Sequence, residues 1–432
     1  MAEYTPVLVL VLSFIYLLAI GTPVAWSIAL SSTLAMLVSI PTLPALTTVS
    51  QRMATGLDSF ALLAIPFFVL SGELMNRGGI AHRLIAFAKT LVGAFPGGLA
   101  LINVIAAILM GAIAGSAMAS ASAMGSILGP EMEKEGYSKE FGAAVNITSA
   151  TTGLVIPPSN VLIVYSLASG GVSIAALFLA GYIPGILTGL FLMAVAVIWA
   201  KKKKYPLGKR SSIVEVFKTF WKAFPSLMLL VVVIGGIVSG IFTATEASAI
   251  AVIYTLFLGF YYKEISLKSL PQILLNSSST TAIVMLLIAA SMSMSWVMSY
   301  ENIPQNISDA LLGVSNNRIV ILLLINLILL FVGIFMDMTP AVLIFTPIFL
   351  PVVTQLGMDP THFGIIMVLN LCIGLCTPPV GSVLFVGVGI AKTSIEKVIK
   401  PLSPLFLAMV VALFLVTYIP QLTLWLPKLF GY

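Results

Sequence analysis

The 432-residue sequence has little charge and very few cysteines or histidines. Asp, Glu, Lys and Arg make up 8% of it, against roughly 25% in soluble domains, which excludes a water-soluble enzyme. Its two cysteines (Cys372, Cys376) and two histidines (His82, His362) cannot build a zinc site or a disulfide framework by themselves. A phosphate loop, H-E-x-x-H and G-x-S-x-G are also missing, which argues against ATP hydrolysis and the commoner hydrolase chemistries. We therefore predict that the chain is not an enzyme and has no cofactor.

Apolar residues dominate the chain. They make up 59% of it, and the mean hydropathy is +1.13. At about 20 residues per crossing, such a chain can cross a bilayer about ten times, with nothing left for a soluble domain. The net charge of +6 lies mostly in loops, so it indicates membrane topology and not nucleic-acid binding. The ten spans predicted by hydropathy are 5–20, 22–40, 59–77, 139–169, 174–200, 224–241, 245–262, 276–299, 362–390 and 402–421.

Two amphipathic stretches, 80–91 and 267–275, are too polar to cross the bilayer. We expect both to lie along the membrane interface as arms that link rigid parts. The first apolar run follows Glu3 and no basic residue, so we interpret it as a retained span and not as a signal peptide.

Two further apolar stretches, 97–134 and 319–356, are each interrupted near the middle. The interruptions are Gly-Ser-Ala-Met-Ala-Ser at 115–120 and Met-Asp-Met-Thr-Pro at 336–340. Each half is about 15 to 18 residues long, which is short for a full span. A re-entrant hairpin, a pair of short antiparallel helices that enters and leaves on one side, fits both stretches.

The two halves of the sequence resemble each other. Gly-Leu-Val-Ile-Pro-Pro at 153–158 aligns with Gly-Leu-Cys-Thr-Pro-Pro at 374–379, an offset of 221 that also pairs Ser116 with Asp337. Each half then holds five spans and one hairpin that adds no crossing, so the second copy is inverted relative to the first. We predict an all-α polytopic membrane protein of two inverted repeats, 1–205 (scaffold helices, hairpin 97–134, broken helix 139–169) and 206–432 (scaffold helices, hairpin 319–356, broken helix 362–390).

The distribution of basic residues tests this topology. If the loop that holds Lys201 to Lys204 is cytoplasmic, only Arg52, Arg318 and Lys428 of the 21 basic residues fall outside. The positive-inside rule therefore favours ten crossings, an outside N-terminus, and hairpins that open to opposite sides. The lysine run itself is a topology determinant that can touch anionic membrane lipid.

Function is expected where the hairpin tips meet the two Pro-Pro breaks, near the bilayer midplane. Each Pro-Pro removes two backbone donors and leaves carbonyls unpaired, at a depth where each unsatisfied group costs several kcal/mol. Oxygen ligands with little negative charge suit a dehydrated monovalent cation, and sodium is the natural candidate. We expect Gly153 and Gly374 to let the chain bend tightly beside each break. Nearby side-chain oxygens belong to Ser149, Thr152, Ser159, Thr377 and Ser382.

The tips also present helix N-termini, whose positive ends favour an anion. Thr339 followed by Pro340 predicts an N-cap at the second tip, and Ser116 or Ser120 an N-cap at the first. Asp337 has either an ion- or substrate-linked role or a capping role. An anion held by helix dipoles, with sodium on unwound carbonyls beside it, is typical of a sodium-coupled carboxylate transporter.

Other polar residues leave two interpretations open. Asn146, Asn160 and Asn370 either line the cavity or form hydrogen bonds between helices. Glu73 and Glu246 lie near span ends, and we expect both to reach the interface.

Several motifs together resemble the large membrane subunit of tripartite ATP-independent periplasmic (TRAP) transporters. They are the paired Pro-Pro breaks, Gly-Ser-Ala-Met-Ala-Ser-Ala-Ser at 115–122, Asp-Met-Thr-Pro at 337–340, Ile-Pro-Phe-Phe at 65–68 and Gly-Glu-Leu-Met at 72–75. The resemblance covers essentially the whole chain. It implies a sodium-driven importer of organic acids in a bacterial inner membrane, working as an elevator. It also implies two partners, a small four-helix membrane subunit and a periplasmic solute-binding protein.

The resemblance also implies site residues. One sodium ion would lie between the first tip, at Ser116, and the carbonyl-rich break, and a second between the second hairpin and its break. The implied sodium-binding residues are Ser116, Gly153, Ile156 and Pro158 for the first ion, and Gly333, Gly374, Thr377 and Val380 for the second. The solute, a C4-dicarboxylate or sialic acid in most family members, is expected near Ser120, Ser159, Asn160, Asp337 and Thr339.

Two alternatives stay open. One is a stand-alone sodium/carboxylate symporter of related inverted-repeat architecture, and the other is a membrane enzyme or channel. No arginine lies in the predicted cavity, so a carboxylate would rely on dipoles, hydroxyls or sodium unless a partner supplies an arginine.

Overall fold

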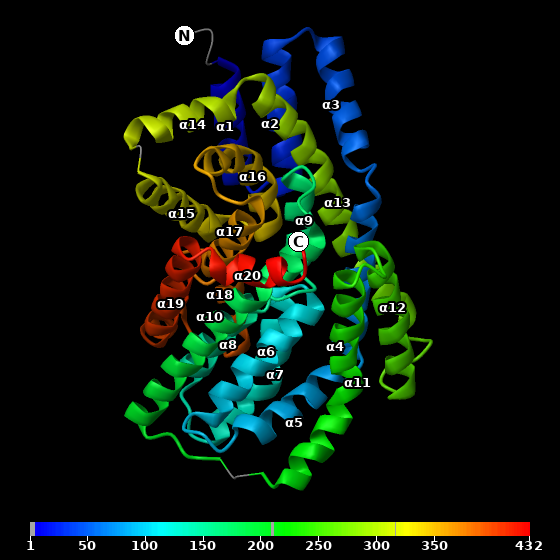
Figure 1. The fold of residues 1–432 in the computed structure, drawn as a ribbon, viewed down its shortest axis with the longest axis vertical. Helices are drawn as coiled ribbons and strands as arrows, with labels where there is room; N and C mark the ends of the chain where they lie inside the picture. Colours follow the sequence, from blue (N-terminus) through cyan, green and yellow to red (C-terminus); the bar gives the residue numbers. More distant parts are fainter. Residues whose placement is uncertain (1–4, 209–210, 316) are drawn as a thin grey trace.

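The computed structural model describes residues 5–208, 211–315 and 317–432, and these residues are overwhelmingly helical (Figure 1). Their one isolated β-bridge joins Pro96 and Leu207. The helices are α1 (Thr5–Ala19), α2 (Val24–Ser39), α3 (Thr42–Gly56), the 3₁₀ turn η2 (Phe60–Leu63), α4 (Ala64–Arg77), α5 (Ile80–Val92), α6 (Gly98–Ala114), α7 (Ala117–Lys134), α8 (Lys139–Thr152), α9 (Asn160–Ala168), α10 (Ile174–Lys203), α11 (Ile213–Val238), α12 (Ala244–Tyr261), α13 (Leu270–Tyr300), α14 (Ile303–Val314), α15 (Arg318–Phe335), α16 (Met338–Gln355), α17 (Pro360–Gly374), α18 (Ser382–Ile390), α19 (Ile395–Tyr418) and α20 (Gln421–Leu429).

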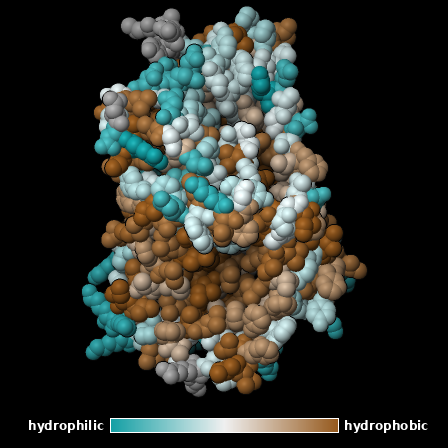
Figure 2. Space-filling view, viewed as in Figure 1, coloured by the Kyte–Doolittle hydropathy of each residue, from teal (hydrophilic) through white to brown (hydrophobic). Residues whose placement is uncertain are grey.

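The predicted all-helical membrane fold is confirmed. Within the described residues, eight helical segments are long and apolar enough to cross a membrane. Four shorter apolar helices, α1, α2, α6 and α17, add to them. One face of the molecule is hydrophobic over much of its lower half, and it is hollowed there (Figure 2). Such a surface is expected to meet lipid or another apolar partner. The number of crossings stays a prediction.

One of the two expected interfacial arms, 267–275, is not an element of its own. The stretch 267–275 leads into and begins α13, which continues without interruption to Tyr300. Polar residues such as Lys268 and Gln272 made it look interfacial, but Gln272 already lies within α13 and donates to Asn276 Oδ1 one turn further along that helix. Short helices that lie across the long axis include α5, as expected from 80–91, and α14, at opposite ends of the molecule (Figure 1).

Two hairpins and two interrupted helices form the centre of the fold. α6 and α7 are joined by a two-residue tip, as are α15 and α16. α6 packs on α8, and α15 packs on α17. α8 and α9 are separated by the first Pro-Pro segment, and α17 and α18 by the second. Both Pro-Pro peptide bonds, Pro157–Pro158 and Pro378–Pro379, are cis.

Glycines explain how closely each hairpin approaches its broken helix. A Cβ on Gly153 would lie 2.7 Å from the Cα of Gly111, and one on Gly374 would lie 2.5 Å from the Cα of Gly333. The expectation that Gly153 and Gly374 permit a tight bend is wrong for Gly153, whose φ of −61° is ordinary helical backbone. Both glycines are needed because a neighbouring backbone occupies the space of a side chain.

Aromatic rings fix the base of the first hairpin. Tyr137 follows α7, and its ring lies 4.3 Å from that of Tyr205, which follows α10. Phe141 at the start of α8 stacks on Trp199 of α10, with ring centroids 5.7 Å apart. The base of the hairpin therefore lies beside the end of α10, which carries Lys201 to Lys203.

Candidate functional site

A cavity of about 270 Å³ lies between the two hairpin tips. Its walls come from both tips, from the starts of α9 and α18, and from α4 and α13. Its polar lining residues are Glu73, Asn76, Ser116, Asn160, Asn276, Ser277, Thr280, Asp337, Thr339 and Ser382. Leu154 and Leu375, next to the two Pro-Pro segments, also line it, so both breaks border the cavity.

The first tip is built by Gly115 and Ser116. Gly115 has a φ of +61°, and a Cβ there would lie 2.8 Å from Nδ2 of Asn160. Ser116 is the N-cap of α7, and its Oγ accepts a hydrogen bond from the Ala119 N–H at 3.3 Å. The N-terminus of α7 and the side chain of Asn160 therefore meet at the cavity wall.

The second tip differs from the expected one. α16 begins at Met338, so the N-cap position is Asp337 and the expected N-cap role of Thr339 is wrong. The helix starts early because Asp337 already has extended N-cap backbone, with φ −69° and ψ 161°. Within the described residues, its carboxylate accepts no side-chain capping hydrogen bond. Asp337 and Thr339 both line the cavity.

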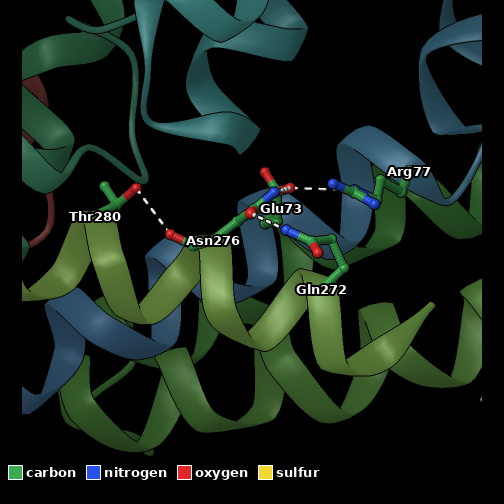
Figure 3. A network of polar contacts seen from close by, with 5 residues as sticks. All are labelled: Glu73, Arg77, Gln272, Asn276 and Thr280. Carbon is green, nitrogen blue, oxygen red and sulfur yellow. Dashed lines mark hydrogen bonds and ion pairs between the residues drawn. The ribbon is translucent and has the colours of Figure 1, made fainter. Parts of the chain in front are cut away.

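Opposite the tips lies a polar wall that sequence reasoning missed (Figure 3). Arg77 Nε donates to Oε1 of Glu73 at 3.2 Å, and Asn276 Nδ2 donates to the same oxygen at 3.1 Å. Gln272 Nε2 donates to Asn276 Oδ1 at 2.8 Å. Glu73 was expected at the interface, and it lies at the cavity instead. Only its i, i+4 spacing from Arg77 signalled an ion pair within α4.

The first break is closed off from its surroundings. Ile156 is 8% exposed, and among the described residues no backbone N–H donates to the carbonyls of Ile156, Pro157 or Pro158. α10 covers this segment. A Cβ on Gly181 of α10 would lie 2.2 Å from the Val155 carbonyl oxygen. The first break is therefore a buried set of carbonyls without backbone donors.

The second break has the same chemistry with less cover. In the described parts of the chain, no backbone N–H donates to a carbonyl between Thr377 and Val380. Gly381, at a φ of +42°, donates its N–H to the Ile334 carbonyl at 3.1 Å and ties the break to α15. Val380 is 39% exposed. These carbonyls lie near the surface of the chain.

The structure brings four of the six predicted tip and helix-start residues to one cavity, Ser116, Asn160, Asp337 and Thr339. Ser120 does not join them, because its Oγ donates to the Ala107 carbonyl at 3.0 Å and holds the two hairpin arms together. Ser159 is 1% exposed and lies outside the cavity lining, with no hydrogen-bond partner for its Oγ among the described residues. The other residues predicted to bind sodium flank the cavity at the glycine contacts and the breaks; they are Gly153, Ile156, Pro158, Gly333, Gly374, Thr377 and Val380.

Comparison with known proteins places the chain in a family. The family model described as "Tripartite ATP-independent periplasmic transporter, DctM component" matches residues 11–422. YgiK of Salmonella typhimurium is 57% identical over 99% of this chain and 98% of its own length. The C4-dicarboxylate TRAP transporter large permease protein DctM of Rhodobacter capsulatus is 38% identical over 96% of this chain and 98% of its own.

The chain is also similar to one more TRAP permease and, in fold, to one solved structure. The sialic acid TRAP transporter large permease protein SiaM of Vibrio cholerae is 40% identical over 89% of this chain and 90% of its own. The YdaH transporter of Alcanivorax borkumensis shares the fold, with a TM-score of 0.65 at 14% identity over 87% of this chain and 88% of that one. The predicted TRAP resemblance is confirmed, and the chain is a transport permease subunit and not an enzyme. It belongs to the DctM component family, the large membrane subunits of tripartite ATP-independent periplasmic transporters, which are multi-pass proteins of the bacterial inner membrane.

Proposed function

We propose that this subunit imports an organic acid by sodium-coupled symport, with the solute in the cavity between the tips and sodium at the two breaks. One observation carries the proposal. Two proline-interrupted segments, each with carbonyls that no backbone N–H satisfies, border a single cavity that both hairpin tips enter. The solute class, a C4-dicarboxylate, sialic acid or a related acid, follows the names of the relatives.

A bound sodium ion would interact with the carbonyl oxygens that no backbone N–H satisfies. An unpaired carbonyl in the hydrocarbon region costs several kcal/mol, and the three in the first break and the four in the second need a donor or a cation. Neutral oxygens at a bend between two half-helices suit a monovalent ion better than a doubly charged one, because no carboxylate is needed to balance it. Sodium is the commonest ion of that kind outside bacterial cells.

Four helix N-termini at the cavity support the proposal that the solute is an anion. The first residues of four helices line the cavity, Ala117 of α7, Asn160 of α9, Met338 of α16 and Ser382 of α18. Each N-terminus carries roughly half a positive charge and free N–H groups. No Lys or Arg belongs to the described lining of the cavity, so the solute carboxylates depend on these ends and on bound sodium.

Movement completes the proposal. The two hairpins and two broken helices, which the proposed repeats 1–205 and 206–432 contribute in inverted orientation, form a transport unit. This unit moves as an elevator against the wall of α4 and α13. The subunit works with two further components, and we propose that they are a four-helix membrane subunit that braces the scaffold and a periplasmic protein that delivers the solute.

Reconstituted uptake tests the function. Proteoliposomes that hold this chain and its small subunit are given a labelled dicarboxylate or sialic acid, with and without an inward sodium gradient and a solute-binding protein. We expect uptake only when both are present. Uptake that needs sodium but no binding protein would identify a stand-alone symporter instead. Uncoupled flux would overturn sodium coupling.

A further inference from the structure

A second cavity of about 480 Å³ lies at the base of the first hairpin, between α7, α8 and the end of α18. This volume falls within the range of about 300–1,000 Å³ that small-molecule sites occupy. The cavity shares no lining residue with the one between the tips. Its contents are therefore separate from the solute site proposed above.

The lining of this basal cavity is positively charged. Its ionisable residues are Glu133, Lys134, Lys139 and Lys392, from three separate segments of the chain. Lys139 pairs with Glu133 at 3.4 Å. Neither Lys134 nor Lys392 has an ion-pair partner in the described part of the chain, so two lysines are left to attract an anion.

Asn146 provides a buried hydrogen-bond acceptor in the lining of the basal cavity. It is 2% exposed, and its Nδ2 donates to the Ala121 carbonyl at 2.7 Å. Its Oδ1 has no hydrogen-bond partner among the described residues. A buried acceptor without a donor destabilises the protein, so a bound molecule with an O–H group is favoured at this atom. The Asn146 side chain packs directly against Gly125 of α7. A Cβ on Gly125 would lie 2.8 Å from Asn146 Nδ2, so the glycine leaves room for this amide.

The wall also has room where a side chain is missing. Gly129, inside α7, has ordinary helical backbone, and a Cβ there would meet no atom within 4 Å. The Cβ of a larger residue at this position would enter open space at the cavity wall. Gly129 therefore offers a way to fill the cavity with no loss of a polar group.

We propose that the basal cavity binds a small oxyanion that carries a hydroxyl group. Lys134 and Lys392 contact the charged oxygens, and Asn146 Oδ1 accepts from the hydroxyl. The cavity lies beside the ring cluster that joins Tyr137 to the end of α10 and its lysine run, the side that the positive-inside rule assigns to the cytoplasm. A hydroxy acid, the product of the import proposed above, and inorganic phosphate are the two sources of this chemistry. Only the link to import rests on the proposed function.

Occupancy would hold the hairpin in place. The ligand would touch α7 of the hairpin together with α8 and α18, so it would oppose movement of the hairpin relative to the broken helices.

Calorimetric titration of the purified subunit in phosphatidylcholine nanodiscs tests the site. Sodium-free choline buffer separates it from the sodium-dependent solute site. The probes are L-malate, succinate, which lacks the hydroxyl, and inorganic phosphate. We expect malate or phosphate to bind, and succinate to bind about tenfold more weakly than malate because one hydrogen bond is lost. Gly129→Leu should abolish binding, and Lys392→Gln should weaken it about tenfold.

Two variants serve as matched controls. Lys397→Gln removes an exposed lysine outside the cavity, and Gly235→Leu adds a side chain in open space on α11. Both should bind as the unchanged subunit does. Binding that is equal for malate and succinate, or that survives both Gly129→Leu and Lys392→Gln, would overturn the proposal, as would no binding of malate or phosphate. The titration measures binding and not uptake. A failure of the basal-cavity proposal is therefore distinguishable from a failure of the proposed transport function.

Discussion

The two broken helices share the sequence Gly-Leu-x-x-Pro-Pro and differ in what covers them. Ile156 in the first break is 8% exposed, whereas Val380 in the second is 39% exposed. The difference arises in a neighbouring helix. α10 presents Gly181 and Gly185 to the first break, and the positions 221 residues later, on α19, are Leu402 and Phe406.

This comparison separates two properties that the sequence motif joins. The Pro-Pro motif leaves backbone carbonyls without N–H donors in both breaks. The neighbouring helix determines how exposed each break is. A Cβ on Gly185 would lie 2.3 Å from the side chain of Ile156, so α10 reaches the first break only because both positions are glycine. We expect the first break to exchange its ion slowly and the second to exchange it readily.

The largest effect is expected for Gly153→Leu. Its Cβ would lie 2.7 Å from the Cα of Gly111, and two backbones cannot both move away without separating the hairpin from the break. Sodium-dependent uptake should fall at least about 100-fold, equivalent to about 2.7 kcal/mol. Membrane insertion, checked by size-exclusion chromatography, should be retained. Gly235→Leu is the control, and normal uptake by Gly153→Leu would contradict the close-packed first break.

Thr377→Pro should have a similar effect at the second break. The Thr377 N–H donates to the Gly374 carbonyl at 2.9 Å, and proline would remove that donor. Uptake assays should show it nearly inactive. Thr377→Val is the matched control. It loses only the bond from Oγ1 to the Ile373 carbonyl at 2.7 Å, about 1 kcal/mol, so uptake should fall by no more than about fivefold. Equal activity of the two variants would refute a backbone role for Thr377.

Gly181→Val tests the cover directly. Its Cβ would lie 2.2 Å from the Val155 carbonyl oxygen, so α10 must move away from the first break. The apparent sodium affinity of uptake should fall about tenfold, a loss of about 1.4 kcal/mol. The counterpart on α19, Leu402→Ala, should change it by less than about threefold, because the second break is already open at Val380, which is 39% exposed. Equal shifts in both variants would remove the difference between the breaks.

The smallest effect is expected for Glu73→Gln, which touches neither break. The Glu73–Arg77 pair is 25% and 39% exposed, and such pairs contribute about 0–1 kcal/mol. The KM for the solute should rise by no more than about fivefold, with sodium affinity unchanged. A large shift in sodium affinity would mean that the wall of α4 and α13 takes part in ion binding.

Local sequence signals predicted the parts of the site that depend on local chemistry. Pro-Pro ends a helix wherever it occurs, and Gly115 and Ser116 form a tip whose geometry is set within a few residues. Contacts between distant segments were not predictable. Asn276 reaches Glu73 across 203 residues of chain, and no periodicity in either helix signals that contact. The unequal cover of the breaks was missed because it depends on which residues of α10 and α19 face them.

The sodium dependence of uptake, fitted for its Hill coefficient, tests the central claim most directly. Two ions on two breaks predict a coefficient above 1 for the unchanged complex and about 1 for a variant that disables one break, since the coefficient cannot exceed the number of sites. Gly181→Val, which weakens sodium binding at the covered break, should lower the coefficient toward 1. Uptake that is equally fast without sodium, or a coefficient that stays the same when either break is altered, would contradict the account.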